Sequence, residues 1–144
     1  MIHVLFQGFE TSDPVLHMRC ADAIEKITAQ RPELLRPFKE QILHHLSQFD
    51  QPEVRWHVAP MLSRLPLSEA EESAVVSLLL SYTDDRSRIV KTLAMQALAD
   101  IALRNRRLLP AIKPHIEELT AIGTPAMKAR GKKLLESLAK DGQS

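Results

Sequence analysis

The sequence predicts an all-α fold, a right-handed α-solenoid of about four helical hairpins, because one helical pattern recurs at a nearly constant spacing. The clearest copy starts at Val90, where apolar or small residues follow at offsets of 4, 7, 8 and 11 positions and so share one helix face. Further copies start at Leu16, Val54 and Met127, and successive starts lie 38, 36 and 37 residues apart. One hairpin cannot bury its apolar face alone, so we expect neighbouring hairpins to stack.

The residues of this recurring stripe are mostly leucine, alanine and other apolar types, and we expect them to form the core. The segments between the copies also repeat, because residues 27–42 and 101–116 align at a shift of 74 positions, which is two repeats. Each repeat should contain an outer helix, a short turn and an inner helix that carries the stripe. In chain order the stripe residues are Leu16, Cys20, Ala23, Ile24, Ile27, Val54, Val58, Met61, Leu62, Leu65, Val90, Ala94, Ala97, Leu98, Ile101, Met127, Gly131, Leu134, Leu135 and Leu138.

The first inner helix is expected to begin at Ser12–Pro14, where a polar cap is followed by a proline in the first turn. It should run to about Ala29 and end before Pro32, because a residue that precedes a proline avoids the helical region. The outer helix that follows is expected from about Glu33 to Phe49, with Pro37 in its first turns.

The second inner helix is expected over residues 52–64, after the capping segment Asp50–Pro52. Pro60 lies inside this helix and should bend it, because proline removes the hydrogen bond to the carbonyl of Trp56. The sequence Leu65–Pro66 ends the helix.

Ser68 and Glu71 have the spacing of a capping box, which predicts the start of a third outer helix over about residues 69–82. The third inner helix follows Asp85 and should end near Arg104. The fourth hairpin completes the predicted array. Its expected parts are an outer helix over 108–122, an inner helix from Gly123–Pro125 to about Lys140, and a frayed tail over 141–144.

Residues 1–8 allow two interpretations. Val4 to Gly8 matches the recognition core of a viral protease that is used to remove purification tags, so this segment can be a remnant of such a tag. However, a shift of 38 residues places Val4, Leu5 and Gly8 on Ile42, Leu43 and Leu46. This alignment favours a native, truncated first helix, and we treat residues 1–144 as a single domain.

The composition excludes several classes of protein. The net charge of +1 provides no general attraction to nucleic acid or to membranes, and no apolar run approaches the ~20 residues of a membrane span. No secretory signal peptide is visible. The only cysteine, Cys20, occupies a stripe position, so we expect a buried, inert thiol in a reducing cytoplasm.

An acidic residue ahead of the inner helix, followed by the pattern V-R/K-x-x-A-x-x-A-L-x-x-I, resembles the HEAT repeat family. The residues that carry this resemblance are Asp50, Val54, Arg55, Leu62, Asp85, Val90, Lys91, Ala94, Ala97, Leu98 and Ile101. The resemblance covers nearly the whole chain from about Asp13, but His17 replaces the usual arginine and no aspartate precedes Lys128. It implies a scaffold that binds proteins on a concave surface. A few HEAT-like proteins bind nucleic acid instead, including DNA alkylation-repair glycosylases.

The residue after each stripe start is basic or histidine. This row of side chains, one from each repeat, can either bind a ligand or connect neighbouring repeats. In HEAT-like arrays the aspartate before the inner helix and the Arg or Lys within it tie adjacent repeats together, so the resemblance favours the structural role. The residues of this predicted inter-repeat ladder are Asp50, Arg55, Asp85, Lys91 and Lys128.

The inner-helix face opposite the stripe carries little charge in the first three repeats, which is unusual for a solvated surface. The only tryptophan lies at its centre, and flexible methionines flank it one repeat away, as suits a peptide-binding groove. The alternative is that these residues pack on one another in a curled solenoid. The predicted partner-binding residues are Met18, Trp56, His57, Thr92, Met95 and Gln96.

No catalytic or metal-binding pattern stands out. His44 and His45 are consecutive on a helix and point about 100° apart, so they do not converge on a metal ion. The chain has no G-x-S-x-G turn and no glycine-rich phosphate loop. We therefore expect a non-enzymatic protein without a cofactor or a metal ion.

Two basic runs, residues 104–107 and 128–133, support the alternative of nucleic-acid binding, provided that they share one surface. Positive charge near helix ends in a solvated terminal repeat also explains them, and we favour this explanation. We therefore expect a protein or peptide partner, with nucleic acid as the second choice. The basic residues in question are Arg104, Arg106, Arg107, Lys128, Arg130, Lys132 and Lys133.

Overall fold

The structure is a computed structural model, and it describes residues 1–142. Within these residues the chain forms eight α-helices and four short 3₁₀ segments, and no strand, so the predicted all-α class is confirmed. The chain forms two compact units, residues 1–75 and the part that begins at Val76. The predicted single domain and the predicted solenoid both concern how these units are joined, and they stay predictions.

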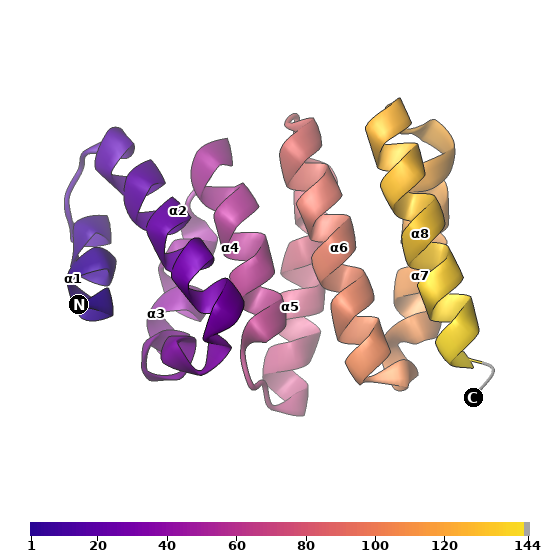
Figure 1. The fold of residues 1–144 in the computed structure, drawn as a ribbon, viewed down its shortest axis with the longest axis horizontal. Coiled ribbons are helices and arrows are strands. Elements are labelled where there is room, and N and C mark those ends of the chain that lie inside the picture. The colour runs from indigo at the N-terminus through magenta and orange to yellow at the C-terminus, as the bar shows by residue number, and fades with distance from the viewer. Residues whose placement is uncertain (143–144) are drawn as a thin grey trace. The chain divides into compact units, whose positions relative to one another are not determined.

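The first unit is built around two long helices, α2 (Pro14–Gln30) and α4 (Pro52–Arg64), which pack against each other along their length (Figure 1). A short helix, α1 (Ile2–Gln7), packs on α2. The helix α3 (Lys39–His44) lies between α2 and α4 in the chain and contacts α4.

Both inner helices of the first unit begin where the sequence predicts. The side chain of Asp13 accepts a hydrogen bond of 3.0 Å from the backbone N–H of Val15, and a proline occupies the first turn of both α2 and α4. Pro60 lies within α4, which continues to Arg64. One turn later the hydroxyl of Ser63 donates to the Pro60 carbonyl at 2.8 Å.

The continuous outer helix predicted from Glu33 to Phe49 was wrong. The structure instead forms the 3₁₀ segments η2 (Pro32–Phe38) and η3 (Leu46–Gln48) on either side of α3. Pro37 explains the first interruption, because its ring nitrogen cannot donate and the ring clashes with the carbonyl four residues earlier. The segment that contains Pro37 therefore adopts the tighter 3₁₀ winding, although the hydrogen bonds of a 3₁₀-helix are poorer.

The N-terminal segment is helical, as one of the two interpretations predicts, but its register differs. Phe6 is buried and stacks on Phe38 with ring centroids 4.1 Å apart, whereas Val4, which the repeat aligns with the buried Ile42, is 57% exposed. The amide of Gln41 donates to the Phe6 carbonyl at 3.1 Å and ties α1 to α3.

The second unit contains α6 (Arg88–Arg104), α7 (Leu109–Ile122) and α8 (Pro125–Gly142). The helices α7 and α8 form a hairpin, and α6 packs against both of them (Figure 1). The boundary between the units falls within α5 (Glu69–Tyr82). The predicted bounds of these four helices are confirmed to within a few residues.

The start of α5 shows the capping box that the sequence predicts. The backbone N–H of Glu71 donates to the Ser68 hydroxyl at 3.2 Å, and the Glu71 carboxylate accepts from the Ser68 N–H at 2.8 Å. The amine of Lys39 lies 2.6 Å from the same carboxylate. Two N–H donors at the start of α5 are thereby satisfied.

The recurring stripe forms the core of each unit. Every stripe residue of α4 and α6 is buried, and so are most of those on α8. The first copy is wrong at its ends, because Leu16 and Ile27 are 36% and 38% exposed. Cys20 is buried as predicted, and burial raises the pKa of its thiol.

The predicted fraying of residues 141–144 lies partly outside the part that the structure describes. The helix α8 extends to Gly142, so the backbone of residues 141 and 142 is helical. Residues 143–144 lie outside the described residues.

Candidate protein-binding site

The packing of α2 on α4 brings together five polar or aromatic side chains, which we call the Trp56 cluster: Asp22, Glu25, Trp56, His57 and Arg64. Asp22 and Glu25 are three residues apart and therefore share one face of α2. His57 and Arg64 are two helical turns apart and share one face of α4. The helix packing places these two faces against each other.

The centre of the cluster is a hydrogen bond between neighbouring residues. The indole Nε1 of Trp56 donates to Nε2 of His57 at 2.9 Å, and both side chains are partly buried. Since Nε2 accepts, it cannot carry a proton, and the neutral ring holds its proton on Nδ1. The bond fixes the indole in one position on the surface formed by α2 and α4.

The carboxylates of the cluster have cationic partners. Arg64 bridges α4 to α2, because its guanidinium donates at 2.9 Å to the Glu25 carbonyl, at 3.1 Å to the Thr28 hydroxyl and at 3.1 Å to the Glu25 carboxylate. Lys26 pairs with Asp22 at 3.1 Å across one turn of α2. The Arg64 bonds connect α4 to α2, whereas the Lys26–Asp22 pair lies within α2.

His57 lies between these carboxylates without a direct hydrogen bond to either. Its Nε2 is 3.6 Å from an Asp22 oxygen, and its buried Nδ1 is 3.8 Å from a Glu25 oxygen. Within the described residues, Nδ1 has no hydrogen-bond partner. Burial lowers the pKa of His57, and the two carboxylates oppose this effect only in part.

Comparison with protein-family models, with curated proteins and with solved structures finds no match to this chain. The resemblance to the HEAT family therefore depends on the residue pattern of the sequence alone.

The predicted partner-binding residues fall into two groups. Met95 was placed wrongly, because it is fully buried in the core of the second unit. Thr92 and Gln96 are partly exposed on α6, and Met18 is partly exposed on α2. Gln96 binds side chains within its own unit: its amide donates to Asp100 at 3.0 Å and its oxygen accepts from Arg130 at 3.2 Å.

The middle of the inner-helix face is more buried than the sequence suggests. Small side chains such as Ala21, Ala59 and Ala99 are at most 1% exposed, so this face packs within each unit. The packing that the alternative predicts is confirmed for these three residues, and the curled solenoid stays a prediction. Among the six predicted binding residues, Trp56 and His57 are joined by a hydrogen bond and a ring contact.

The predicted inter-repeat ladder is not tested by these contacts. The Nε of Arg55 donates to the Phe49 carbonyl at 2.9 Å, and the Asp85 carboxylate accepts from the Ser87 N–H at 2.8 Å, both within short segments. Asp50 and Lys128 are exposed, and Lys91 is partly exposed. A ladder between repeats stays a prediction.

The basic residues of the second unit are spread along α8. Arg106 donates to the Leu138 carbonyl at 3.0 Å, near the end of α8, whereas Arg130 binds Gln96 near its start. These anchor points on α8 are eight residues apart, which is roughly 12 Å along a helix. Lys132 and Lys133 are exposed between them, and Arg104 and Arg107 are exposed near Arg106 in the chain.

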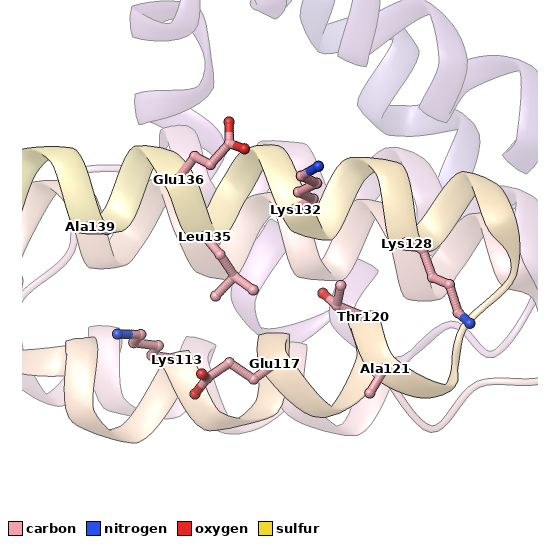
Figure 2. Close-up of a pocket in the computed structure, with 9 residues that line it drawn as sticks. All are labelled: Lys113, Glu117, Thr120, Ala121, Lys128, Lys132, Leu135, Glu136 and Ala139. Atoms are coloured by element: carbon pink, nitrogen blue, oxygen red, sulfur yellow. The ribbon is translucent and has the colours of Figure 1, made fainter.

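A groove of about 700 Å³ runs between α7 and α8. In Figure 2, Leu135 points from α8 toward α7, while charged side chains of both signs extend along the rims. The residues that line the groove are Lys113, Glu117, Thr120, Ala121, Lys128, Lys132, Leu135, Glu136 and Ala139. The mixed charges give it no single electrostatic preference.

Two further features bear on function. Among residues 1–140, whose side chains the structure describes, no three histidine, cysteine, aspartate or glutamate side chains are grouped to hold a metal ion. None of the described helices combines the length and apolar character that a membrane span requires.

Sequence reasoning placed Trp56 and His57 in a site but missed Arg64, which connects α4 to α2. The available signal was the seven-residue spacing between His57 and Arg64, together with the three-residue spacing of Asp22 and Glu25. These spacings predict shared helix faces. They do not predict which face of α2 meets which face of α4.

Proposed function

We propose that this chain is a non-enzymatic scaffold that binds a protein or peptide through its inner helices, in the cytoplasm. In this proposal the hairpins stack as a short, right-handed α-solenoid of the HEAT type, as the sequence repeat predicts. The surface around Trp56 on α2 and α4 is the binding site.

The observation that carries the proposal is the position of Trp56. Its indole is partly exposed, yet its N–H is held at 2.9 Å by His57. A tryptophan that is fixed before binding loses little conformational freedom when a partner covers it, and its large surface supplies much of the affinity. Tryptophan is among the residue types most enriched at interface hot spots.

The other members of the cluster support a binding role over a catalytic one. Glu25 is engaged by Arg64, Asp22 by Lys26, and the accepting nitrogen of His57 by Trp56. Side chains that hold one another in this way position the indole and shape its surroundings. A general acid or base needs instead to reach a substrate proton.

Nucleic-acid binding ranks second. A nucleic-acid site requires a basic surface that follows the phosphate backbone. Arg106 binds the Leu138 carbonyl near the end of α8, whereas Arg130, near the start of α8, binds Gln96 of α6. Moreover, the carboxylates beside Trp56 would repel phosphates, so a glycosylase-like use of Trp56 receives no support from this arrangement.

The proposal can be tested with peptides selected from a random display library on the immobilised full chain at neutral pH. Peptides that bind at the proposed site should lose affinity for the Trp56→Ala variant by more than about 1 kcal/mol, roughly fivefold, as hot-spot residues do. Isothermal titration calorimetry with purified peptides measures this change.

The matched control is the double variant Lys128→Glu, Lys132→Glu, which alters the groove between α7 and α8. Its affinity for the same peptides should equal that of the unmodified chain. If the selected peptides depend on the two lysines and not on Trp56, the binding site lies on the second unit and the proposal is wrong.

A further inference from the structure

The Trp56–His57 contact depends on the protonation state of the imidazole. In the structure Nε2 of His57 accepts from the indole, which requires a free electron pair on that nitrogen. When the ring becomes an imidazolium, both nitrogens carry protons and neither can accept. The indole N–H would then face another N–H donor at 2.9 Å, and the hydrogen bond would be lost.

The charged groups that act on the imidazole come from α2. Asp22 and Glu25 have oxygens 3.6 and 3.8 Å from its two nitrogens, and both favour the imidazolium. Lys26 disfavours the imidazolium, and Arg64 of α4 compensates part of the Glu25 charge. Desolvation by burial is the largest effect, and it lowers the pKa of His57 below its usual value.

The distances define what protonation would change. A hydrogen bond to a carboxylate needs a separation of about 2.7–3.0 Å, so each carboxylate lies less than about 1.2 Å too far from the ring. A small rotation of the imidazolium, or of the acidic side chains, would form one or two charge-assisted bonds. Such bonds are stronger than the neutral indole bond that they replace.

We propose that His57 is a pH-sensitive switch that holds Trp56 in place when neutral and releases it when acidification protonates the ring. The switch comprises Trp56, His57 and the carboxylates of Asp22 and Glu25. That it regulates partner binding rests on the proposed function, in which the fixed indole is the anchor. Acidification should weaken binding, because a released indole has to be ordered again on association.

The switch itself can be tested on the isolated chain by nuclear magnetic resonance, without any partner. The chain has a single tryptophan, so its indole N–H gives a single signal. At neutral pH the ¹⁵N shifts of His57 should show a proton on Nδ1 and none on Nε2. On lowering the pH from about 7.5 to about 5, the His57 and indole signals should change with the same midpoint.

The exchange of the indole proton with solvent measures the release directly. It should become about threefold to tenfold faster beyond the expected effect of pH itself, the range for the loss of one neutral hydrogen bond. His57→Gln should remove the transition. Asp22→Asn should lower its midpoint, because it removes one of the charges that favour the imidazolium.

His44→Gln is the matched control, because His44 is an exposed histidine on α3 that pairs with Glu40 in the same unit. The indole transition should persist in this variant with an unchanged midpoint. An indole signal that stays constant while His57 titrates would overturn the switch. A proton on Nε2 of His57 at neutral pH would also overturn the switch. This measurement uses the unmodified chain, so it does not depend on the folding of any variant.

The regulatory consequence needs a separate measurement. A peptide selected at neutral pH on the Trp56 site should bind the unmodified chain about threefold to tenfold more weakly near pH 5.5 than near pH 7.5. The His57→Gln variant should lose most of this difference. If the indole transition occurs but no selected peptide depends on Trp56, the switch stands and the proposed function fails. If peptides depend on Trp56 and the indole does not respond to pH, the switch fails and the proposed function stands.

Discussion

Gly131 of α8 lies so close to Thr120 of α7 that a methyl group at position 131 would overlap the Thr120 hydroxyl. The same hydroxyl donates to the Ile116 carbonyl at 2.6 Å, which holds it on its own helix. The two helices of the α7–α8 hairpin therefore approach closely at this point, and the absence of a side chain at position 131 permits the approach.

We expect the added methyl group of Gly131→Ala to cost about 1–3 kcal/mol, the usual cost of overpacking. Alanine gains about 1 kcal/mol over glycine in helix propensity, so the net destabilisation should be about 0–2 kcal/mol. Urea denaturation measures the change. The second substitution Thr120→Ala should restore part of the loss, and two additive effects would show that the helices do not meet here.

Leu98 is fully buried on α6, and Leu98→Ala should reduce the free energy of unfolding by about 2–5 kcal/mol. Ile89→Ala on the same helix is the control, because Ile89 is 51% exposed and should cost far less. Denaturant melts of both variants provide the comparison. Equal losses, or a loss at Leu98 below about 0.5 kcal/mol, would contradict the repeat register.

The sequence predicted the buried residues correctly for helices whose apolar stripe is covered along its whole length. The residues of α4 and α6 follow the 3.6-residue period, and all their stripe positions are buried. Leu16 and Ile27 follow the same period but are partly exposed at either end of α2. Periodicity identifies the apolar face of a helix, but it does not reveal where the neighbouring elements end.

The outer segment around α3 shows a local effect that periodicity does not detect. Leu35 and Ile42 are both buried as the pattern suggests, yet the backbone between them changes from 3₁₀ to α-helix at Phe38. Pro37 causes this change through the loss of one donor. Met95 shows the opposite error. The helix pattern placed it outside the apolar stripe, but the packing of the second unit buries it completely.

The Trp56 cluster could be predicted only in part. The sequence predicted Trp56 and His57 as binding residues but did not predict Arg64. The bond from Trp56 to His57 joins adjacent residues, which point about 100° apart on a helix, so it depends on the side-chain rotamers. The bridge from Arg64 to Glu25 depends on how α2 crosses α4, which a single sequence does not specify.

The stability of the chain should depend on pH through Glu71. The hydrogen bond from Lys39, followed by that from the Ser68 backbone, lowers the pKa of Glu71 below its usual value. A carboxyl with a lowered folded-state pKa stabilises the fold above its unfolded pKa, and this contribution is lost as the pH falls through the folded pKa. Thermal melts in acid should show a smaller loss of stability for Lys39→Met than for the unmodified chain. An identical acid dependence in both would exclude this pairing.

The basic residues of α8 should not support tight nucleic-acid binding near physiological salt. Phosphate contacts would make affinity fall steeply with salt through counterion release. Fluorescence anisotropy with a labelled oligonucleotide at several salt concentrations measures this dependence. Tight, salt-sensitive binding that is lost in the double variant Lys132→Glu, Lys133→Glu would favour the nucleic-acid function instead.

Trp56 should be reachable by solvent in the isolated chain and should contribute little to stability. The structure leaves the indole partly exposed, with one hydrogen bond to His57, so Trp56→Ala loses that bond and only part of a buried surface. The expected loss is below about 2 kcal/mol, against about 3–5 kcal/mol for a fully buried tryptophan. Acrylamide should quench the fluorescence of this single tryptophan, and a denaturant melt of the variant gives its stability. A blue-shifted emission that acrylamide cannot reach, or a loss in the range of a buried residue, would place Trp56 in the core and remove the anchor of the proposed binding site.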